Sequence, residues 1–137
     1  MRYVRLFFVL AAAVVSLLPA AASAADKSFG LWKNPSGSVH VRAEPCGDRM
    51  CGTVAWANDK AKADALRGGT DNLIGLQLFR GFVLEKPGVW RGKVYVPDIA
   101  KTFSGTVTVI DRNTLKGAGC LLGRFGCKSQ LWTRIAE

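Results

Sequence analysis

Hydrophobic and polar positions alternate along most of this chain, in short runs separated by turn residues. The run at 38–44 places Val39, Val41 and Ala43 on one side, which is the period-two pattern of a half-buried strand. Glycine, proline and asparagine clusters, such as the one at 34–37, mark tight turns between the runs. Further runs of this kind lie at 29–33, 50–56, 75–79, 82–85, 89–96, 102–110, 114–122 and 128–135. The pattern predicts eight or nine antiparallel strands in a sandwich or a barrel.

Two places depart from this alternation. The segment 58–72 is rich in alanine, lysine and aspartate, and it predicts a short exposed helix or excursion near 59–67, followed by a loop that contains Gly68 and Gly69. The dipeptide Arg80-Gly81 separates two runs without a full turn signal, so we expect a kink or bulge there.

A matched pair of motifs at the two ends of the strand region favours a barrel over a sandwich. Gly30-x-Trp32 opens the first strand, and Trp132-x-Arg134 lies on the last one. In a sheet that curls until its ends meet, a guanidinium can cover an indole, a contact that is worth roughly 0.5–2 kcal/mol. We therefore predict that Trp32, Trp132 and Arg134 are structural residues that close the barrel.

The first 24 residues have the features of a Sec-type signal peptide. Arg2 and Arg5 precede an apolar stretch of 13 residues at 6–18, and Ala22-Ser23-Ala24 is a small-residue cleavage site. The stretch is shorter than the ~20 residues that a membrane-spanning helix needs, although an uncleaved anchor is the alternative. Cleavage near Ala24 leaves one domain at 25–137, a periplasmic or secreted location, and no membrane span.

The charge of the remaining domain limits its partners. It has 17 basic and 10 acidic residues, a net charge near +7, and the basic residues are scattered along the chain. Outside the cytoplasm nucleic acid is not an expected partner, whereas a weak contact with anionic envelope surfaces is. A positive charge that only aids solubility is the alternative.

Four cysteines form two local pairs, Cys46 with Cys51 and Cys120 with Cys127. In an oxidising compartment this count indicates disulfides, and the local connectivity is favoured because each pair flanks a predicted hairpin turn. The two other connectivities, free thiols and a zinc site remain as alternatives, although the longer spacing is loose for zinc.

Several motifs occur in the order found in one protein family. The chain resembles a family of small secreted bacterial proteins known only as domain-of-unknown-function family twenty-one forty-seven. The resemblance implies a lipocalin-like (calycin-type) barrel, so the expected fold is an all-β, antiparallel up-and-down barrel of about eight strands. It implies no activity and no catalytic residues. At 96–101 the chain departs from the family pattern, since Ala100 stands where a glycine would permit positive φ. The motifs that carry the resemblance are Gly30-Leu31-Trp32, Cys46–Gly52, Leu73–Leu76, Trp90–Pro97, Lys101–Gly105, Leu115–Gly117 and Gln130–Arg134.

Catalysis has little support in the sequence. His40 is the single histidine, it lies on an alternating strand, and no Gly-x-Ser-x-Gly motif accompanies it. Asp98 and Asp111, which would have to serve a carboxylate-based hydrolase, lie at predicted turns. We assign no catalytic residue, no metal site and no cofactor, and the hydrolase stays as an alternative.

Aromatic and polar residues point instead to binding. Lys93 and Tyr95 share one strand face, where a cation beside a phenol suits an anionic head group. The leading hypothesis is non-catalytic binding of a small apolar or anionic amphipathic ligand in the barrel. The alternative is a structural or stress-related envelope protein with a solid core. The candidate ligand-binding residues are Trp56, Trp90, Lys93, Tyr95, Asp98, Lys101, Thr102 and Phe103.

Overall fold

The structure is a computed structural model that describes residue 14 and residues 27–137. Apart from Val14, the predicted signal peptide and its cleavage near Ala24 fall outside the described residues.

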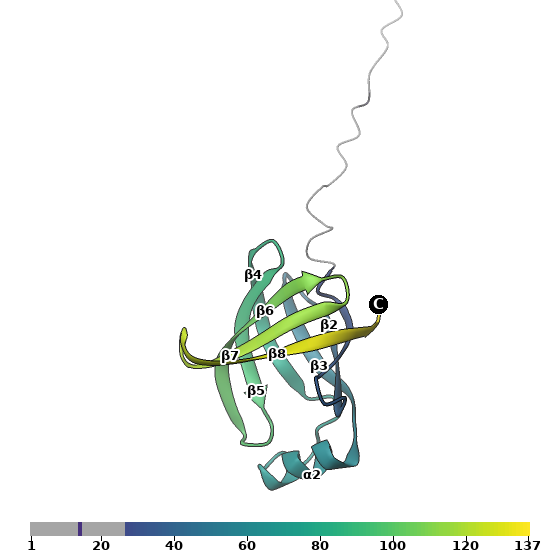
Figure 1. Cartoon of the computed structure of the whole chain (residues 1–137), viewed down its shortest axis with the longest axis vertical. Coiled ribbons are helices and arrows are strands. Elements are labelled where there is room, and N and C mark those ends of the chain that lie inside the picture. The colour runs from purple at the N-terminus through teal and green to yellow at the C-terminus, as the bar shows by residue number, and fades with distance from the viewer. Residues whose placement is uncertain (1–13, 15–26) are drawn as a thin grey trace, which may run out of the picture.

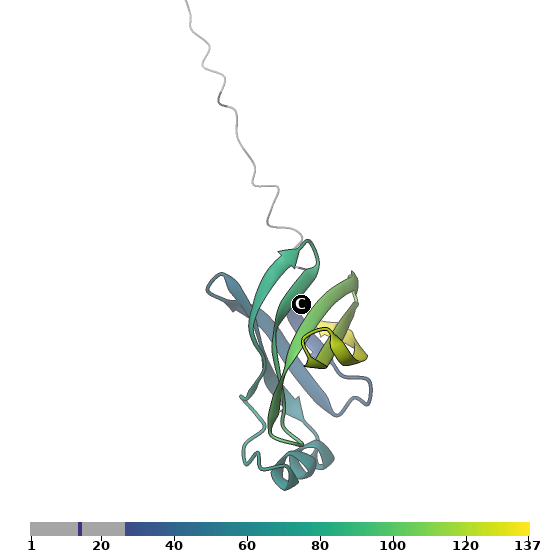
Figure 2. The same cartoon turned by 90° about the vertical axis from the view of Figure 1, so that its left-hand side faces the viewer.

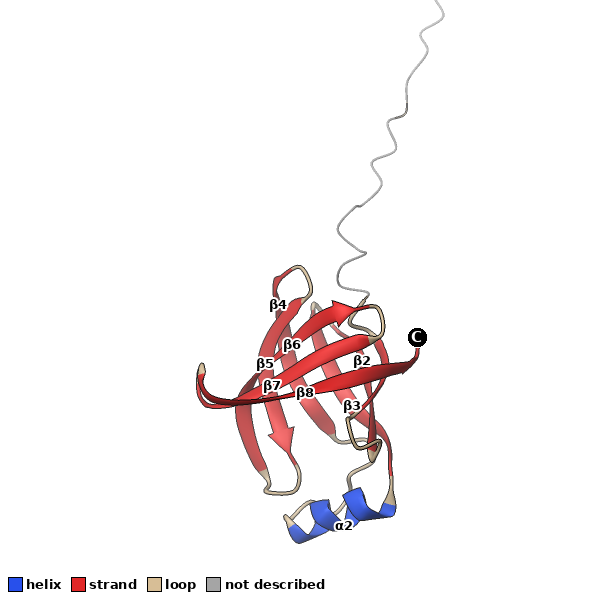
Figure 3. Cartoon of the chain, in the orientation of Figure 1, coloured by secondary structure: helices blue, strands red, loops and turns tan. Residues whose placement is uncertain are grey.

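Eight antiparallel strands form a closed barrel in which every strand pairs with its neighbours along the chain and β1 pairs with β8 (Figure 1). Strands make up nearly all of the regular structure, as Figure 3 shows. This confirms the predicted all-β, antiparallel up-and-down barrel of about eight strands. The strands are β1 (Gly30–Lys33), β2 (Val39–Cys46), β3 (Arg49–Ala57), β4 (Gln77–Lys86), β5 (Val89–Val96), β6 (Lys101–Asp111), β7 (Thr114–Leu122) and β8 (Phe125–Ala136).

The predicted break at Arg80-Gly81 is a bulge within one strand. The runs at 75–79 and 82–85 are not separate strands, because β4 passes through both. Its pairing with β5 shifts between Arg80 and Val83, and Gly81 has φ +57°. Glycine tolerates this left-handed conformation without the clash that a Cβ would introduce.

The helix α2 (Asp59–Arg67) lies at one end of the barrel (Figure 1). Its N-cap is Asn58, whose side-chain oxygen accepts a hydrogen bond from the Ala61 nitrogen at 2.8 Å. It turns one small residue, Ala65, into the core. On its exposed side, Lys60 donates a hydrogen bond to Asp64, which together with the positive charge of Lys60 and Arg67 lowers the pKa of the Asp64 carboxyl. The predicted helix near 59–67 is confirmed.

The core of the barrel consists of aromatic and aliphatic side chains from all eight strands. Several aromatic rings meet edge to face: Phe79 lies 5.7 Å from Phe82 and 5.8 Å from Trp132, between ring centroids. Gly52 lies opposite Phe79 on the neighbouring strand, and the Phe79 ring occupies the space that a side chain at position 52 would need. Large rings therefore fill the interior by packing over glycines.

The cysteines pair locally, as favoured from the sequence. Cys46 bonds Cys51 across the β2–β3 turn, and Cys120 bonds Cys127 near the end of the β7–β8 hairpin. The Cα atoms lie 5.8 and 4.0 Å apart, respectively. Two disulfides are typical of an oxidising compartment outside the cytoplasm.

Ala100 adopts φ +51° in the turn between β5 and β6. The turn thus keeps the left-handed geometry that a glycine would take more easily, although this chain carries an alanine. Within residues 27–137, no helix is long and apolar enough to span a membrane.

Candidate functional site

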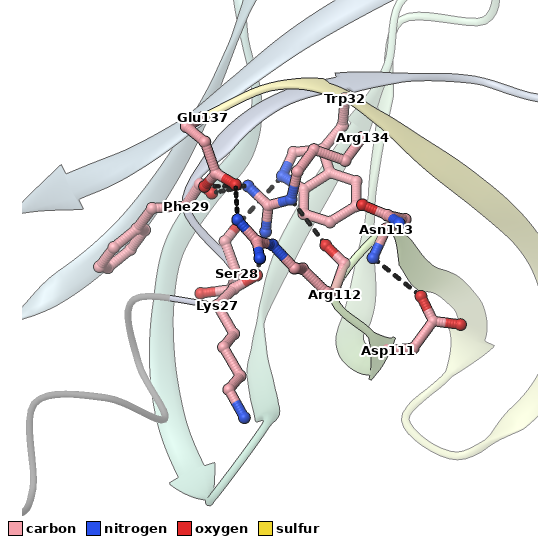
Figure 4. A network of polar contacts seen from close by, with 9 residues as sticks. All are labelled: Lys27, Ser28, Phe29, Trp32, Asp111, Arg112, Asn113, Arg134 and Glu137. Carbon is pink, nitrogen blue, oxygen red and sulfur yellow. Dashed lines mark hydrogen bonds and ion pairs between the residues drawn. The ribbon is translucent and has the colours of Figure 1, made fainter.

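One end of the barrel is closed by Arg134 and the residues that precede β1 (Figure 4). The Arg134 guanidinium lies 4.3 Å from the centre of the Trp32 ring. It donates hydrogen bonds to the carbonyl oxygens of Phe29, Lys27 and Arg112, at 2.5, 2.5 and 2.7 Å. The Trp32 indole nitrogen donates to the Ser28 carbonyl at 3.0 Å. The structure therefore places Trp32 and Arg134 at the seam where β1 pairs with β8.

The centre of the barrel is filled. Trp32, Met50 and Phe82 are fully buried, and Trp90 and Trp132 are nearly so. An internal cavity large enough for a water molecule would leave accessible surface on the side chains that line it. The expected ligand pocket inside the barrel is therefore not present around these residues, and the aromatic side chains act as core.

The eight predicted ligand residues do not form one site. Trp90 is buried near the closed end, with its ring 6.0 Å from that of Phe29. Trp56 is 45% exposed and packs against His40, at 4.5 Å between ring centres. A shift in the β2–β3 pairing after His40 reverses the alternation of β3, so that Ala57 instead of Trp56 points into the core.

The remaining predicted residues lie along β5 and β6. Asp98 is exposed in the turn, and its backbone carbonyl lies so close to Gly68 that a side chain at 68 would overlap it. Lys101 and Thr102 are exposed and Phe103 is half-buried at the start of β6. The Tyr95 hydroxyl lies 3.1 Å from Thr70 Oγ1 beneath the loop that follows α2. Lys93 lines a cavity.

That cavity is a cleft on the outside of the barrel, of about 670 Å³, which we call the basic cleft. The outer faces of β3 to β6 form its floor, and the turn of the β7–β8 hairpin forms one side. It is lined by Arg49, Arg80, Gly81, Val83, Arg91, Gly92, Lys93, Ser104, Gly123 and Arg124.

Five cationic side chains converge on the basic cleft, and one carboxylate meets them. Glu85 lies 2.9 Å from Arg91 Nε and 3.8 Å from a terminal nitrogen of Arg124. Arg49, Arg80 and Lys93 have no ion-pair partner in the described part of the chain. The cleft thus carries a surplus of positive charge, which favours anions.

Arg80 is held in place without an acid. Its Nε donates to the Gln77 carbonyl at 3.0 Å, and its guanidinium lies 4.4 Å from the centre of the Tyr95 ring. Lys93 Nζ lies 3.3 Å from Ser104 Oγ. The pairing Arg80↔Lys93 sets these two cations side by side on neighbouring strands. Tyr95 therefore contributes to the cleft indirectly, because its ring supports the Arg80 guanidinium.

The sequence contained a partial signal for this cleft. Arg91 and Lys93 are two residues apart, so they share one face of β5. The other cations come from strands and a turn far apart in sequence, and only the barrel closure brings them together. No local pattern predicts that convergence.

A second cavity of about 690 Å³ lies at the closed end, next to Lys27, Asp111, Arg112, Arg134 and Glu137. Its charges are largely compensated, since Glu137 pairs with Arg112 at 3.1 Å and lies 3.5 Å from Arg134. It therefore offers less attraction for a ligand than the basic cleft.

The carboxylates proposed for the hydrolase are far apart. Asp98 precedes β6 and Asp111 ends it, and β6 has 11 residues. At about 3.3 Å per residue the strand itself is roughly 30 Å long, so the two aspartates lie at opposite ends of it. The Asp111 side chain accepts a hydrogen bond from the Asn113 nitrogen at 2.8 Å, which fixes the turn. Residues 27–137 contain no group of three histidine, cysteine or acidic side chains that could hold a metal ion.

Comparisons with known proteins agree with the fold. The family model described as an uncharacterized protein conserved in bacteria, DUF2147, matches residues 30–134. Protein HP1028 from Helicobacter pylori, described as belonging to the lipocalin family, superposes with a TM-score of 0.61 over 80% of this chain and 83% of that chain. The sequence identity is 13%, so this likeness concerns the fold alone. Among curated proteins, none matches the chain.

Proposed function

Because the chain belongs to the DUF2147 family of uncharacterised bacterial proteins, we propose a function from its geometry. The protein is a non-catalytic binding protein of the periplasm or the extracellular space. It binds anionic amphipathic molecules, and the anionic group occupies the basic cleft. The location rests on the two disulfides and on the signal-peptide pattern of the first 24 residues.

The surplus of positive charge in the basic cleft is the observation that carries this proposal. Guanidinium groups suit phosphate and carboxylate, since each offers several donors in a fixed plane. Arg80 already has a fixed orientation over Tyr95, so little conformational entropy is lost when it binds an anion. The single acid, Glu85, is engaged by Arg91 and Arg124 and is not free to act as a general base.

An apolar side chain at the same cleft suits the other half of an amphipathic ligand. Val83 lines the cleft and is about half exposed. An acyl chain can lie along this surface while its head group contacts the cations. The interior of the barrel then keeps a purely structural role.

A solid-cored structural protein of the envelope is the second candidate. The packed interior is the specific observation that favours it. Such a protein would use the same positive surface for weak, non-selective contacts. The two candidates differ in whether the basic cleft binds one small anionic ligand with defined stoichiometry.

Calorimetric titration with octyl phosphate distinguishes them, with octyl glucoside as the uncharged probe of equal chain length. We expect one molecule of octyl phosphate to bind per protein, and no binding of octyl glucoside. The double variant Arg49→Gln/Lys93→Gln removes two cations that have no acid partner, and it should weaken binding at least about tenfold.

The matched control is Lys62→Gln/Lys116→Gln, which removes the same charge at exposed positions outside the cleft. It should change the affinity less than about twofold. Equal weakening by both double variants, or no saturable binding by the unmodified protein, would favour the structural protein.

A further inference from the structure

The end of the β7–β8 hairpin carries an exposed apolar cluster. We call residues 120–128 the hairpin tip, which the Cys120–Cys127 disulfide fastens. Within it Leu121, Leu122 and Phe125 are 69%, 75% and 78% exposed. In Figure 1 this end of the hairpin projects beyond the left side of the barrel, and in Figure 2 it faces the viewer. The tip is therefore presented away from the core.

This exposure is unusual for three large apolar side chains in five residues. The tip is a two-stranded ribbon whose residues 121–127 are all exposed. Arg124 approaches Glu85 of β4, but the three apolar side chains are not covered by the described barrel. Single exposed apolar residues need no explanation, whereas a clustered set marks a surface that meets an apolar partner. The disulfide keeps the cluster in a defined shape while it remains outside the core.

Positive charge accompanies the cluster. The stretch 112–136 contains five basic residues and no acidic one. Arg124 lies at the turn of the tip and Lys128 follows the disulfide. Gly123 and Arg124 also line the basic cleft, so the tip and the cleft form one continuous surface.

We infer that the hairpin tip docks on a bilayer that contains anionic lipid. Leu121, Leu122 and Phe125 enter the boundary between head groups and acyl chains, while Arg124 and Lys128 contact lipid phosphates. Docking brings the basic cleft to the lipid surface, and in this respect alone the inference rests on the proposed function. The protein would then exchange its anionic ligand directly with the membrane.

Charge favours a bilayer over a second copy of the chain as the occupant. Two copies that met through their tips would oppose Arg124 and Lys128 to like charges, which disfavours the contact. An anionic membrane instead complements these side chains and accepts the apolar ones at the same time.

The test is flotation of the exported, disulfide-bonded protein with vesicles. Vesicles of phosphatidylglycerol mixed with phosphatidylcholine should carry the protein, and vesicles of phosphatidylcholine alone should carry much less. The variant Leu121→Ser/Leu122→Ser/Phe125→Ser should lower partitioning at least about tenfold. The control Leu66→Ser/Ile99→Ser/Ile110→Ser removes exposed apolar side chains elsewhere and should partition like the unmodified protein.

The fluorescence of an introduced tryptophan measures contact with the acyl region. Phe125→Trp should be quenched by brominated lipid in anionic vesicles, whereas Ile110→Trp should not, each measured against the unmodified protein. Absence of flotation, equal flotation of the tip variant, or equal quenching of both reporters would overturn the inference. So would concentration-dependent dimerisation that the tip variant abolishes, since the occupant would then be a second copy.

Octyl phosphate separates this inference from the proposed function. The tip variant should still bind octyl phosphate in solution, because Arg49, Arg80 and Lys93 are unchanged. Flotation without octyl phosphate binding would leave membrane docking supported and the ligand proposal wrong. Octyl phosphate binding without flotation would leave the ligand proposal supported and membrane docking wrong.

Discussion

Arg134 is the residue that ties the start of the described chain to its last strand. Its side chain is only 6% exposed, and it donates to three backbone carbonyls while covering Trp32. Arg134→Lys keeps the charge but loses the planar fork, so at least one carbonyl is left without its donor. We expect the free energy of unfolding to fall by about 2–3 kcal/mol, measured by urea denaturation.

The control for this prediction is Arg112→Lys. The Arg112 side chain is highly exposed, and its ion pair with Glu137 lies at the surface. Its replacement should change stability by less than about 0.5 kcal/mol. A similar loss in both variants would show that Arg134 does not have the special role in closure that its hydrogen bonds indicate.

Single residues show how far the sequence predicts this structure. The motifs that contain Trp32 and Arg134 predict the contact between these two residues, because that contact requires only that the first and last strands pair. The inward or outward direction of Trp56 was not predictable, since it depends on a bulge after His40 that shifts the register. A one-residue shift of this kind moves a side chain to the other face of the sheet.

At the scale of strands, the Phe79 ring of β4 packs over Gly52 of the paired strand β3. A methyl group at position 52 would overlap Phe79, which cannot move because Phe82 and Trp132 surround it. Gly52→Ala should therefore destabilise the protein by about 1–3 kcal/mol, measured by thermal and urea unfolding.

Gly119→Ala is the matched substitution on β7. A Cβ at this position would have no neighbour closer than 4.0 Å, and Gly119 does not have positive φ. Stability should change by no more than about 0.5 kcal/mol. If Gly119→Ala cost as much as Gly52→Ala, the loss would come from β-strand glycines in general and not from the contact with Phe79.

Turn signals and alternation predicted the strands and α2 because both are local properties of the chain. The basic cleft was missed for the opposite reason. Arg49, Arg80 and Arg124 come from β3, β4 and the β7–β8 turn, and they meet because the projecting hairpin bends so that its turn borders the cleft. That bend is a tertiary feature, which alternation along a strand does not encode.

For the whole molecule, the two disulfides contribute unequally to the global free energy of unfolding. Cys51 is buried and its bond closes the turn between the paired strands β2 and β3, whereas Cys120–Cys127 fastens a tip whose side chains at 121–127 are all exposed. A cross-link lowers the entropy of the unfolded chain, but where the native segment would itself be mobile it restricts the native state as well. The Cys120–Cys127 bond therefore adds less to the free energy of unfolding than the Cys46–Cys51 bond does.

We therefore expect Cys46→Ser/Cys51→Ser to lower the free energy of unfolding by about 2 kcal/mol, and Cys120→Ser/Cys127→Ser to lower it by less than about 1 kcal/mol. The second variant should instead show faster amide hydrogen exchange confined to the hairpin tip, with the barrel strands still protected. Urea denaturation and hydrogen exchange measure the two effects separately. Equal losses of global stability would mean that the tip unfolds together with the barrel, and its apolar cluster would then belong to the cooperative core and not to a separate docking element.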